Sequence, residues 1–379
     1  LMSGILRPGP QIAVVETDAL DALPDLLLAD GIRSVLFVHG VKSLQAAAQY
    51  LPDLAARGIR IVEASFAGEC SPGEIERLRL LSIAEGIEGV LGLGGGKVLD
   101  AAKAVAFGAG KVPVFLVPTL ASTCSAWSAV SVYYDDEHHH LGHDVWPVPT
   151  RAVLIDPRII FDSPVDFFVS GIADTLAKWV ETRPLFEREA VLNTFGALAK
   201  TTARQCRDVP FEDGASAVDD MRAGRLSQQW QAVMEASIIS AGIVGGFGGE
   251  LGKATAAHPV SDGLSALDRT RDLLHGIKVA YGILVQLALE RRWDDVDSLR
   301  SLYAALGLPR SLADLQVEVS DVSALREIAD IAVDSSSSIH LLEENLSAER
   351  VVQALTELEE FQAGLPPVAV AGRDSTCFA

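Results

Sequence analysis

Cysteine is scarce in this chain and never closely spaced. The four cysteines, Cys70, Cys124, Cys206 and Cys377, are scattered, and no Cys-x-x-Cys pair occurs. A disulfide framework is therefore not expected, and reduced thiols in a reducing compartment are the default interpretation. The cysteine pattern predicts a cytoplasmic protein.

Basic residues are also in deficit. The chain has 31 lysines and arginines against 51 aspartates and glutamates, which gives a formal net charge of −20 and a pI of about 4.7. Nucleic acids and anionic membranes attract basic surfaces, so neither is expected as a partner. We also expect neither a signal peptide nor a membrane span, because no leader pattern and no sufficiently long apolar run is recognisable.

Apolar sequence, in contrast, is plentiful. Hydrophobic residues make up 49% of the 379 residues, enough for about two to three domains with sizeable cores. Up to residue 163, short β-branched runs alternate with helical patterns, which predicts a parallel sheet covered by helices. The predicted strands cover 11–16, 33–38, 59–62, 89–92, 112–117 and 151–156, and the helices between them include 44–56 and 71–85.

From residue 164 onward, apolar residues recur at helical spacing instead. The predicted helices cover 166–180, 189–206, 227–241, 274–292, 296–306 and 348–360. The expected fold is an α/β parallel-sheet nucleotide-binding domain over residues 1–163. An all-α domain over residues 164–379 follows it.

A histidine-rich segment interrupts the strand–helix alternation. Tyr133, Asp135 and Asp136 precede the run His138-His139-His140 and predict a surface hairpin. Neighbouring residues on a strand point to opposite faces, so these histidines and His143 cannot all face one metal ion. We interpret the segment as solvated.

A glycine-rich turn follows the predicted strand at 89–92. Its sequence is Gly94-Gly95-Gly96-Lys97, and a helical pattern comes next. Glycines let backbone N–H groups approach a phosphate, and a helix N-terminus favours an anion. The turn matches neither the dinucleotide fingerprint, which needs glycine where Lys97 stands, nor a P-loop, which needs Ser or Thr where Val98 stands. A diphosphate site of another type and a tight structural turn both fit.

Hydroxyl side chains follow another predicted strand, in the segment Thr119, Ser122 and Thr123. Ligands of α/β proteins bind at the carboxyl ends of parallel strands. A helix cap with a turn is the alternative interpretation. Two such segments on one sheet favour a ligand site.

Six ordered motifs carry a family resemblance. They are GGGKVLD at 94–100, PTLAST at 118–123, SVYY at 131–134, GIADTLAKW at 171–179, AAH at 256–258 and HGIKVAYG at 275–282. With these motifs, the chain resembles the iron-containing alcohol dehydrogenase superfamily in its glycerol dehydrogenase-like branch. The resemblance implies the dehydroquinate synthase-like architecture of an α/β nicotinamide-binding domain followed by a helical metal-binding domain. It also implies a homo-oligomer.

The same resemblance assigns a metal centre to Asp174, His258 and His275. One carboxylate and two imidazoles suit Zn²⁺ or Fe²⁺ and leave a position open for a substrate oxygen. Without the resemblance, Asp174 reads as a helix cap or ion-pair residue and both histidines as structural residues.

Cofactor contacts follow from the motifs in the same way. The resemblance implies that NAD(H) or NADP(H) binds at two sets of residues. The diphosphate turn comprises Gly94, Gly95, Gly96, Lys97 and Asp100, and the remaining contacts are Thr119, Ser122, Ser128, Val130 and Tyr134. No acidic residue follows the strand at 33–38 to hold a ribose 2′-hydroxyl, whereas Lys42 either meets a 2′-phosphate or is a solvated lysine.

Two departures from the family pattern concern the substrate pocket. Glycerol dehydrogenases carry Asp where this chain has Cys124, so glycerol is not favoured. The segment around Cys124 resembles hydroxycarboxylate dehydrogenase-type members, although a small pocket-lining residue is the simpler interpretation. Many members carry a second histidine where this chain has Ser261. Arg269 and Arg271 either bind a substrate carboxylate or pair with acidic surface residues.

The predicted function is therefore metal-dependent, NAD(P)-linked interconversion of a small secondary alcohol, such as a 2-hydroxy acid, and its carbonyl compound. No catalytic residue beyond the metal centre is assigned. A glycerol or polyol dehydrogenase, a lyase of the dehydroquinate synthase type and a catalytically silent binding protein are the alternatives.

Overall fold

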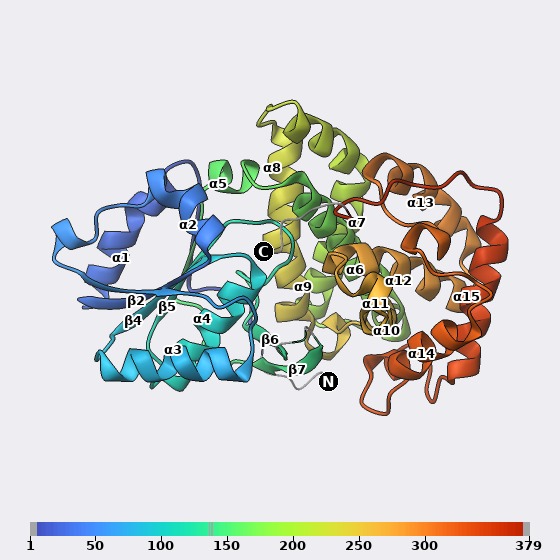
Figure 1. The fold of residues 1–379 in the computed structure, drawn as a ribbon, viewed down its shortest axis with the longest axis horizontal. Coiled ribbons are helices and arrows are strands. Elements are labelled where there is room, and N and C mark those ends of the chain that lie inside the picture. The colour runs from blue at the N-terminus through green and yellow to red at the C-terminus, as the bar shows by residue number, and fades with distance from the viewer. Residues whose placement is uncertain (1–5, 136, 138, 374–379) are drawn as a thin grey trace. The chain divides into compact units, whose positions relative to one another are not determined.

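The computed structural model describes residues 6–373 except Asp136 and His138 of the predicted hairpin, so that Cys377 also lies outside the described residues. The chain forms two compact units (Figure 1). We call Arg7–Pro164 the N-terminal unit and the part that begins at Val165 the C-terminal unit.

The N-terminal unit is built on a six-stranded parallel sheet with the order β1-β8-β5-β4-β2-β3. The strands are β1 Ile12–Val15, β2 Ser34–His39, β3 Arg60–Ser65, β4 Gly89–Gly94, β5 Val114–Pro118 and β8 Ala152–Ile155. Each lies within or beside a predicted strand, so the predicted fold class is confirmed. The chain leaves β2 toward β3 but leaves β4 in the opposite direction toward β5. The topological switch point, where α/β proteins bind ligands, therefore lies at the carboxyl ends of β2 and β4.

Helices cover both faces of this sheet. They are α1 Leu23–Ala29, α2 Val41–Ala47, α3 Pro72–Ala84, α4 Gly96–Gly108 and α5 Pro157–Phe161. Figure 1 shows α1 and α2 on one face and α3 and α4 on the other. Successive strand residues point to opposite faces, and Phe37, Leu91 and Phe115 share one buried cluster with residues of α1.

The helix predicted at 44–56 is shorter than expected. α2 ends at Ala47, and short 3₁₀ turns follow it. Leu51 has extended backbone angles of φ −76° and ψ 127°, because the ring of Pro52 disfavours a helical residue before it.

The predicted surface hairpin is confirmed for its described residues. β6 Val130–Tyr134 pairs antiparallel with β7 His140–Val145. In the turn, His139 Nδ1 lies 2.9 Å from Asp135 Oδ2. These two side chains and Glu137 place possible metal donors near one another, but on an exposed surface where acidic groups are common without a metal.

The C-terminal unit is helical. Its helices are α6 Val165–Arg188, α7 Thr194–Arg222, α8 Gln228–Glu235, α9 Ala241–Gly248, α10 Ala257–Ala266, α11 Asp268–Arg271, α12 His275–Leu289, α13 Trp293–Leu306, α14 Val322–Ala332 and α15 Ala348–Gln362. Two of the longer helices, α10 and α14, are not among the predicted ones. In α10, Pro259 and Gly263 weaken the helical pattern, although proline is tolerated in a first helical turn.

One apolar segment corrects an expectation. Gln228–Gly252, which contains α8, α9 and a π-helical turn at Ala236–Ser240, is long and apolar enough to cross a membrane by length and composition alone. The expectation that no such run exists was therefore wrong. Half of its most apolar window is buried inside the structure, as in the core helix of a globular protein, so it is weak evidence for a membrane span.

Close packing of β4 against α4 yields a stability prediction. A Cβ atom added at Gly92 would lie 2.7 Å from Ala102 Cβ and 3.1 Å from Leu116 Cδ2. We expect Gly92→Ala to destabilise the N-terminal unit by about 1–3 kcal/mol, because overpacking forces a backbone shift. Denaturant-induced unfolding measures this change. Gly73→Ala is the matched control, because its nearest atom lies 4.0 Å away, and equal loss in both variants would contradict the prediction.

Candidate active site

Three helices of the C-terminal unit each contribute one residue to a compact donor group. Asp174 lies in α6, His258 is in the first turn of α10, and His275 begins α12. Asp174 Oδ1 lies 3.1 Å from His258 Nε2 and 3.7 Å from His275 Nε2. One ligand atom from each residue lies within 4.8 Å of the others. The structure therefore brings together the residues that the family resemblance assigns to the metal.

The donor group fits a divalent transition metal. Both imidazoles turn Nε2 toward the same carboxylate oxygen, and this set of one oxygen and two nitrogens suits Zn²⁺ or Fe²⁺. Asp174 is buried, and a buried carboxylate requires a cationic or hydrogen-bonding partner. Burial alone would raise the pKa of Asp174, but the charge of Lys178 and hydrogen bonds to the two histidines hold it well below its usual value.

Small residues allow the three helices to approach this closely. A Cβ atom at Gly276 of α12 would lie 1.9 Å from Ser170 O of α6. A Cβ atom at Gly282 would lie 2.2 Å from Ala257 O of α10. Only glycine fits at these crossings, so the glycines of the HGIKVAYG motif help to set where His275 lies relative to Asp174 and His258.

The glycine turn of the N-terminal unit joins β4 to α4. Gly95 precedes α4 and has no side chain to cap it, so the first N–H groups of the helix suit an anion such as a diphosphate. A Cβ atom added at Gly94 would lie 2.7 Å from Val98 Cβ, and one added at Gly95 would lie 2.8 Å from Leu120 Cδ1. A Cβ atom added at Gly96 would lie 3.1 Å from Thr123 Oγ1. None of the three has a positive φ angle, so space rather than backbone conformation requires glycine here.

The predicted contact Asp100 is occupied by internal partners. Its carboxylate is buried and accepts hydrogen bonds from Ser125 Oγ at 2.5 Å and Val132 N at 3.0 Å. Lys103, which is also buried, lies 2.8 Å from it and donates to the backbone carbonyls of Ser125, Ser128 and Val130. Asp100 and Lys103 thus hold the loop that carries Ser128 and Val130. Sequence reasoning did not single out Lys103.

Other predicted cofactor residues gather at the carboxyl edge of the sheet. Thr119 donates its backbone N–H to Gly94 O, and its hydroxyl donates to Ser43 Oγ in α2. Lys97 pairs with buried Glu69 and lies 5.5 Å from the centre of the Tyr134 ring. Ser122 is half-buried in the loop after β5.

The end of β2 carries an interaction that the sequence did not indicate. His39 is buried, and its Nε2 lies 3.0 Å from Glu63 Oε1 on the neighbouring strand β3. A carboxylate therefore lies beside the end of β2, although none follows β2 in sequence. Lys42 lies in the first turn of α2.

The predicted pocket residues Cys124 and Ser261 differ in exposure. Cys124 is half-buried and not disulfide-bonded. Ser261 lies within α10 and is fully buried, and its Oγ has no hydrogen-bond partner among the described residues. A direct substrate contact through Ser261 therefore has little structural support.

Arg269 and Arg271 are held by carboxylates of the protein itself. Arg269 pairs with Asp321 at 2.6 Å, and Arg271 pairs with Asp268 at 2.7 Å. The ion-pair interpretation of these arginines fits better than substrate binding.

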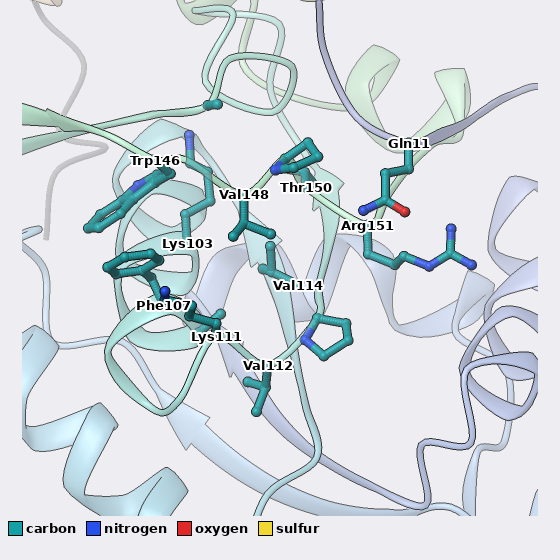
Figure 2. Close-up of a pocket in the computed structure, with 14 residues that line it drawn as sticks. Gln11, Lys103, Phe107, Lys111, Val112, Val114, Trp146, Val148, Thr150 and Arg151 are labelled. Atoms are coloured by element: carbon teal, nitrogen blue, oxygen red, sulfur yellow. The ribbon is translucent and has the colours of Figure 1, made fainter. Parts of the chain in front are cut away.

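One hollow of the N-terminal unit lies away from the glycine turn. Its walls include Phe107 and Trp146, with ring centres 4.7 Å apart, and it is also lined by Lys111 and Arg151 (Figure 2). These residues surround the amino ends of β5 and β8, which is the sheet edge opposite the glycine turn. None of the predicted cofactor residues lines the hollow, although Ala129, which lies between Ser128 and Val130, does.

The surroundings of His258 yield a pH prediction. Burial alone would lower the pKa of His258, but the charge of Glu181 and hydrogen bonds to Asp174 and Glu181 raise it to about 10. A metal must displace this proton, so the apparent Zn²⁺ affinity should rise about tenfold per pH unit between about pH 6 and pH 8. Titration calorimetry in buffers of different ionisation enthalpy measures the protons released. A pH-independent affinity without proton release would contradict this.

Comparison with known proteins places the chain in a family. Residues 10–157 match the family model described as iron-containing alcohol dehydrogenase. Hydroxycarboxylate dehydrogenase A of Escherichia coli (strain K12) is 33% identical over 356 residues, which cover 94% of this chain and 97% of that protein. A glycerol dehydrogenase of Pseudomonas putida is 36% identical over 346 residues, which cover 89% and 92%.

Solved structures agree with this relationship. The crystal structure of a probable glycerol dehydrogenase from Sinorhizobium meliloti 1021 matches with a TM-score of 0.85 and 28% identity, covering 96% of this chain and 100% of that chain. The resemblance stated from the motifs is therefore confirmed. The chain belongs to the iron-containing alcohol dehydrogenase family and is a metal-dependent, NAD(P)-linked oxidoreductase of that family.

Proposed function

We propose that Asp174, His258 and His275 bind the metal of this oxidoreductase and that the reacting oxygen of a small alcohol or carbonyl substrate binds beside them. The observation that carries this proposal is the convergence of two imidazole Nε2 atoms on Asp174 Oδ1. When bound, the divalent ion supplies Lewis-acid polarisation, and the nicotinamide exchanges a hydride. The three side chains hold the ion and leave coordination positions for the substrate.

We further propose that the N-terminal unit, residues 1–163 in the predicted division, binds NAD(H) or NADP(H). The uncapped N-terminus of α4 with Gly94, Gly95, Gly96 and Lys97 would receive the diphosphate. Thr119, Ser122, Ser128, Val130 and Tyr134 would supply the remaining contacts. Asp100 would act indirectly, by holding the loop after β5 in place through its hydrogen bonds from Ser125 and Val132.

For the substrate, we propose a 2-hydroxy acid and its 2-oxo acid. The thiol of Cys124 occupies the position at which glycerol dehydrogenases carry a carboxylate, and an uncharged side chain there tolerates an anionic substrate. The hydroxycarboxylate dehydrogenase of Escherichia coli is similar over nearly its full length. Glycerol is the second candidate, because the Pseudomonas putida glycerol dehydrogenase is 36% identical.

The remaining expectations are also proposals. The net charge of −20 supports a protein that binds neither nucleic acid nor anionic membranes. We propose a cytoplasmic homo-oligomer, as the family resemblance implies.

Removal of the metal should abolish turnover. We expect a strong chelator, and separately Asp174→Asn, to lower the rate of NAD(P)H-dependent carbonyl reduction at least 100-fold, because the substrate oxygen loses its polarising cation. Absorbance of NADH and of NADPH over a panel of 2-oxo acids, aldehydes and ketones, with polyols assayed in the oxidative direction, measures the rate. Asp268→Asn, in a surface ion pair, is the control variant. Unchanged turnover after chelation, or turnover with no net oxidation or reduction of the cofactor as in a lyase, would contradict the proposal.

The substrate proposal has its own test at Cys124. A carboxylate introduced by Cys124→Asp should repel a 2-oxo acid and lower its kcat/KM at least tenfold, while glycerol oxidation improves or stays constant. Cys124→Ser keeps the side chain small and neutral and serves as the matched control. If glycerol is the better substrate of the unchanged protein, the 2-hydroxy acid proposal is wrong.

A further inference from the structure

A buried carboxylate contacts the metal-site histidine from the side opposite Asp174. Glu181 lies about two helical turns after Asp174 in α6 and is 1% exposed. Its Oε2 lies 2.6 Å from His258 Nδ1, while His258 Nε2 faces Asp174. One helix therefore contacts both nitrogens of the same imidazole.

The other carboxylate oxygen of Glu181 binds the backbone rather than the imidazole. Glu181 Oε1 accepts hydrogen bonds from the backbone N–H groups of His258 at 3.0 Å and Thr255 at 3.1 Å. Because both donors are backbone groups, this oxygen is fixed in place. The carboxylate plane is thereby oriented so that Oε2 meets the imidazole.

Gln286 of α12 completes the anchoring of the same segment. Its Oε1 accepts from the backbone N–H groups of Ala256 at 3.0 Å and Ala257 at 3.2 Å. Ala256 precedes α10 and has no side chain that could cap the helix. Glu181 and Gln286 therefore satisfy the backbone donors that the start of α10 leaves open, a role that local side chains fill in most helices.

We propose that Glu181 is a positioning residue of the metal centre that fixes the tautomer of His258. A carboxylate only accepts hydrogen bonds, so Nδ1 carries a proton toward Glu181, and once a metal replaces the proton that Nε2 shares with Asp174, the Nε2 lone pair is directed at the metal. Carboxylates that hold a metal-binding histidine in this way also increase its basicity as a ligand. The inference rests on the proposed metal site and deepens it.

Glu181→Gln tests this inference with little change in shape. The amide oxygen can keep both backbone hydrogen bonds, which leaves the NH₂ group facing His258 Nδ1. That group only donates, so it favours the tautomer with the proton on Nε2 and none on Nδ1, and a proton held on Nε2 blocks the metal. We expect Zn²⁺ affinity, measured by competition with a chromophoric chelator, to fall about 10- to 100-fold.

Glu359→Gln is the matched control. Glu359 of α15 also accepts a backbone N–H, from Leu312 at 2.9 Å, and a hydroxyl, from Tyr281 at 2.8 Å. It is hydrogen-bonded to neither histidine in the described residues, so a general loss of stability would affect both variants, whereas loss of Zn²⁺ affinity should occur only in Glu181→Gln. Equal Zn²⁺ affinity in Glu181→Gln and the unchanged protein, with affinity lost in Asp174→Asn, would overturn the inference and leave the metal site intact. Unchanged affinity in Asp174→Asn as well would overturn both.

A second measurement needs no folded variant at Glu181. ¹⁵N NMR of the Zn²⁺-loaded, histidine-labelled protein, with His258 assigned from a His258→Asn spectrum, reports which ring nitrogen carries the proton. We expect a protonated Nδ1 and a metal-bound Nε2. A protonated Nε2 would overturn the inference.

Discussion

The proposed metal site depends on a buried negative charge. Asp174 sits in the buried part of α6, and its carboxylate is stable there because His258, His275 and the charge of Lys178 accompany it. This requirement draws α10 and α12 against α6, and Gly276 and Gly282 remove the side chains that would prevent the contact. The buried charge of Asp174 and the small size of Gly276 and Gly282 therefore both favour the same close packing of α10 and α12 with α6.

Backbone groups around the site follow the same logic. The first turn of α10 carries His258, a proposed metal ligand, but its N-cap residue is Ala256, which has no side chain to cap the helix. Buried side chains from α6 and α12 accept its N–H groups instead. The start of α10, the proposed metal ligands and the interhelical hydrogen bonds thus form one buried polar network, and such networks are stable when every member is satisfied.

In the N-terminal unit, the glycine turn at the start of α4 would let the backbone approach the proposed diphosphate closely. Glycines between β4 and α4 make room for Val98, Leu120 and Thr123, and they leave the start of α4 without a capping side chain. Lys103 then holds the neighbouring loop through three carbonyl oxygens and Asp100. The buried ammonium group of Lys103 thus satisfies carbonyl oxygens of this loop.

The strands, most of the helices and the family resemblance were predictable from the amino-acid sequence, because hydrophobic periodicity and ordered motifs are local signals. It also supplied Asp174, His258 and His275 through the resemblance. It did not reveal Glu181, Gln286 or Lys103, and it missed α10 and α14. These residues act through partners far away in the chain, such as Glu181 and His258, and no local pattern encodes such a pair. Which buried polar groups meet depends on the three-dimensional packing of the helices, because a buried polar group requires a partner and the packing brings a particular partner into reach.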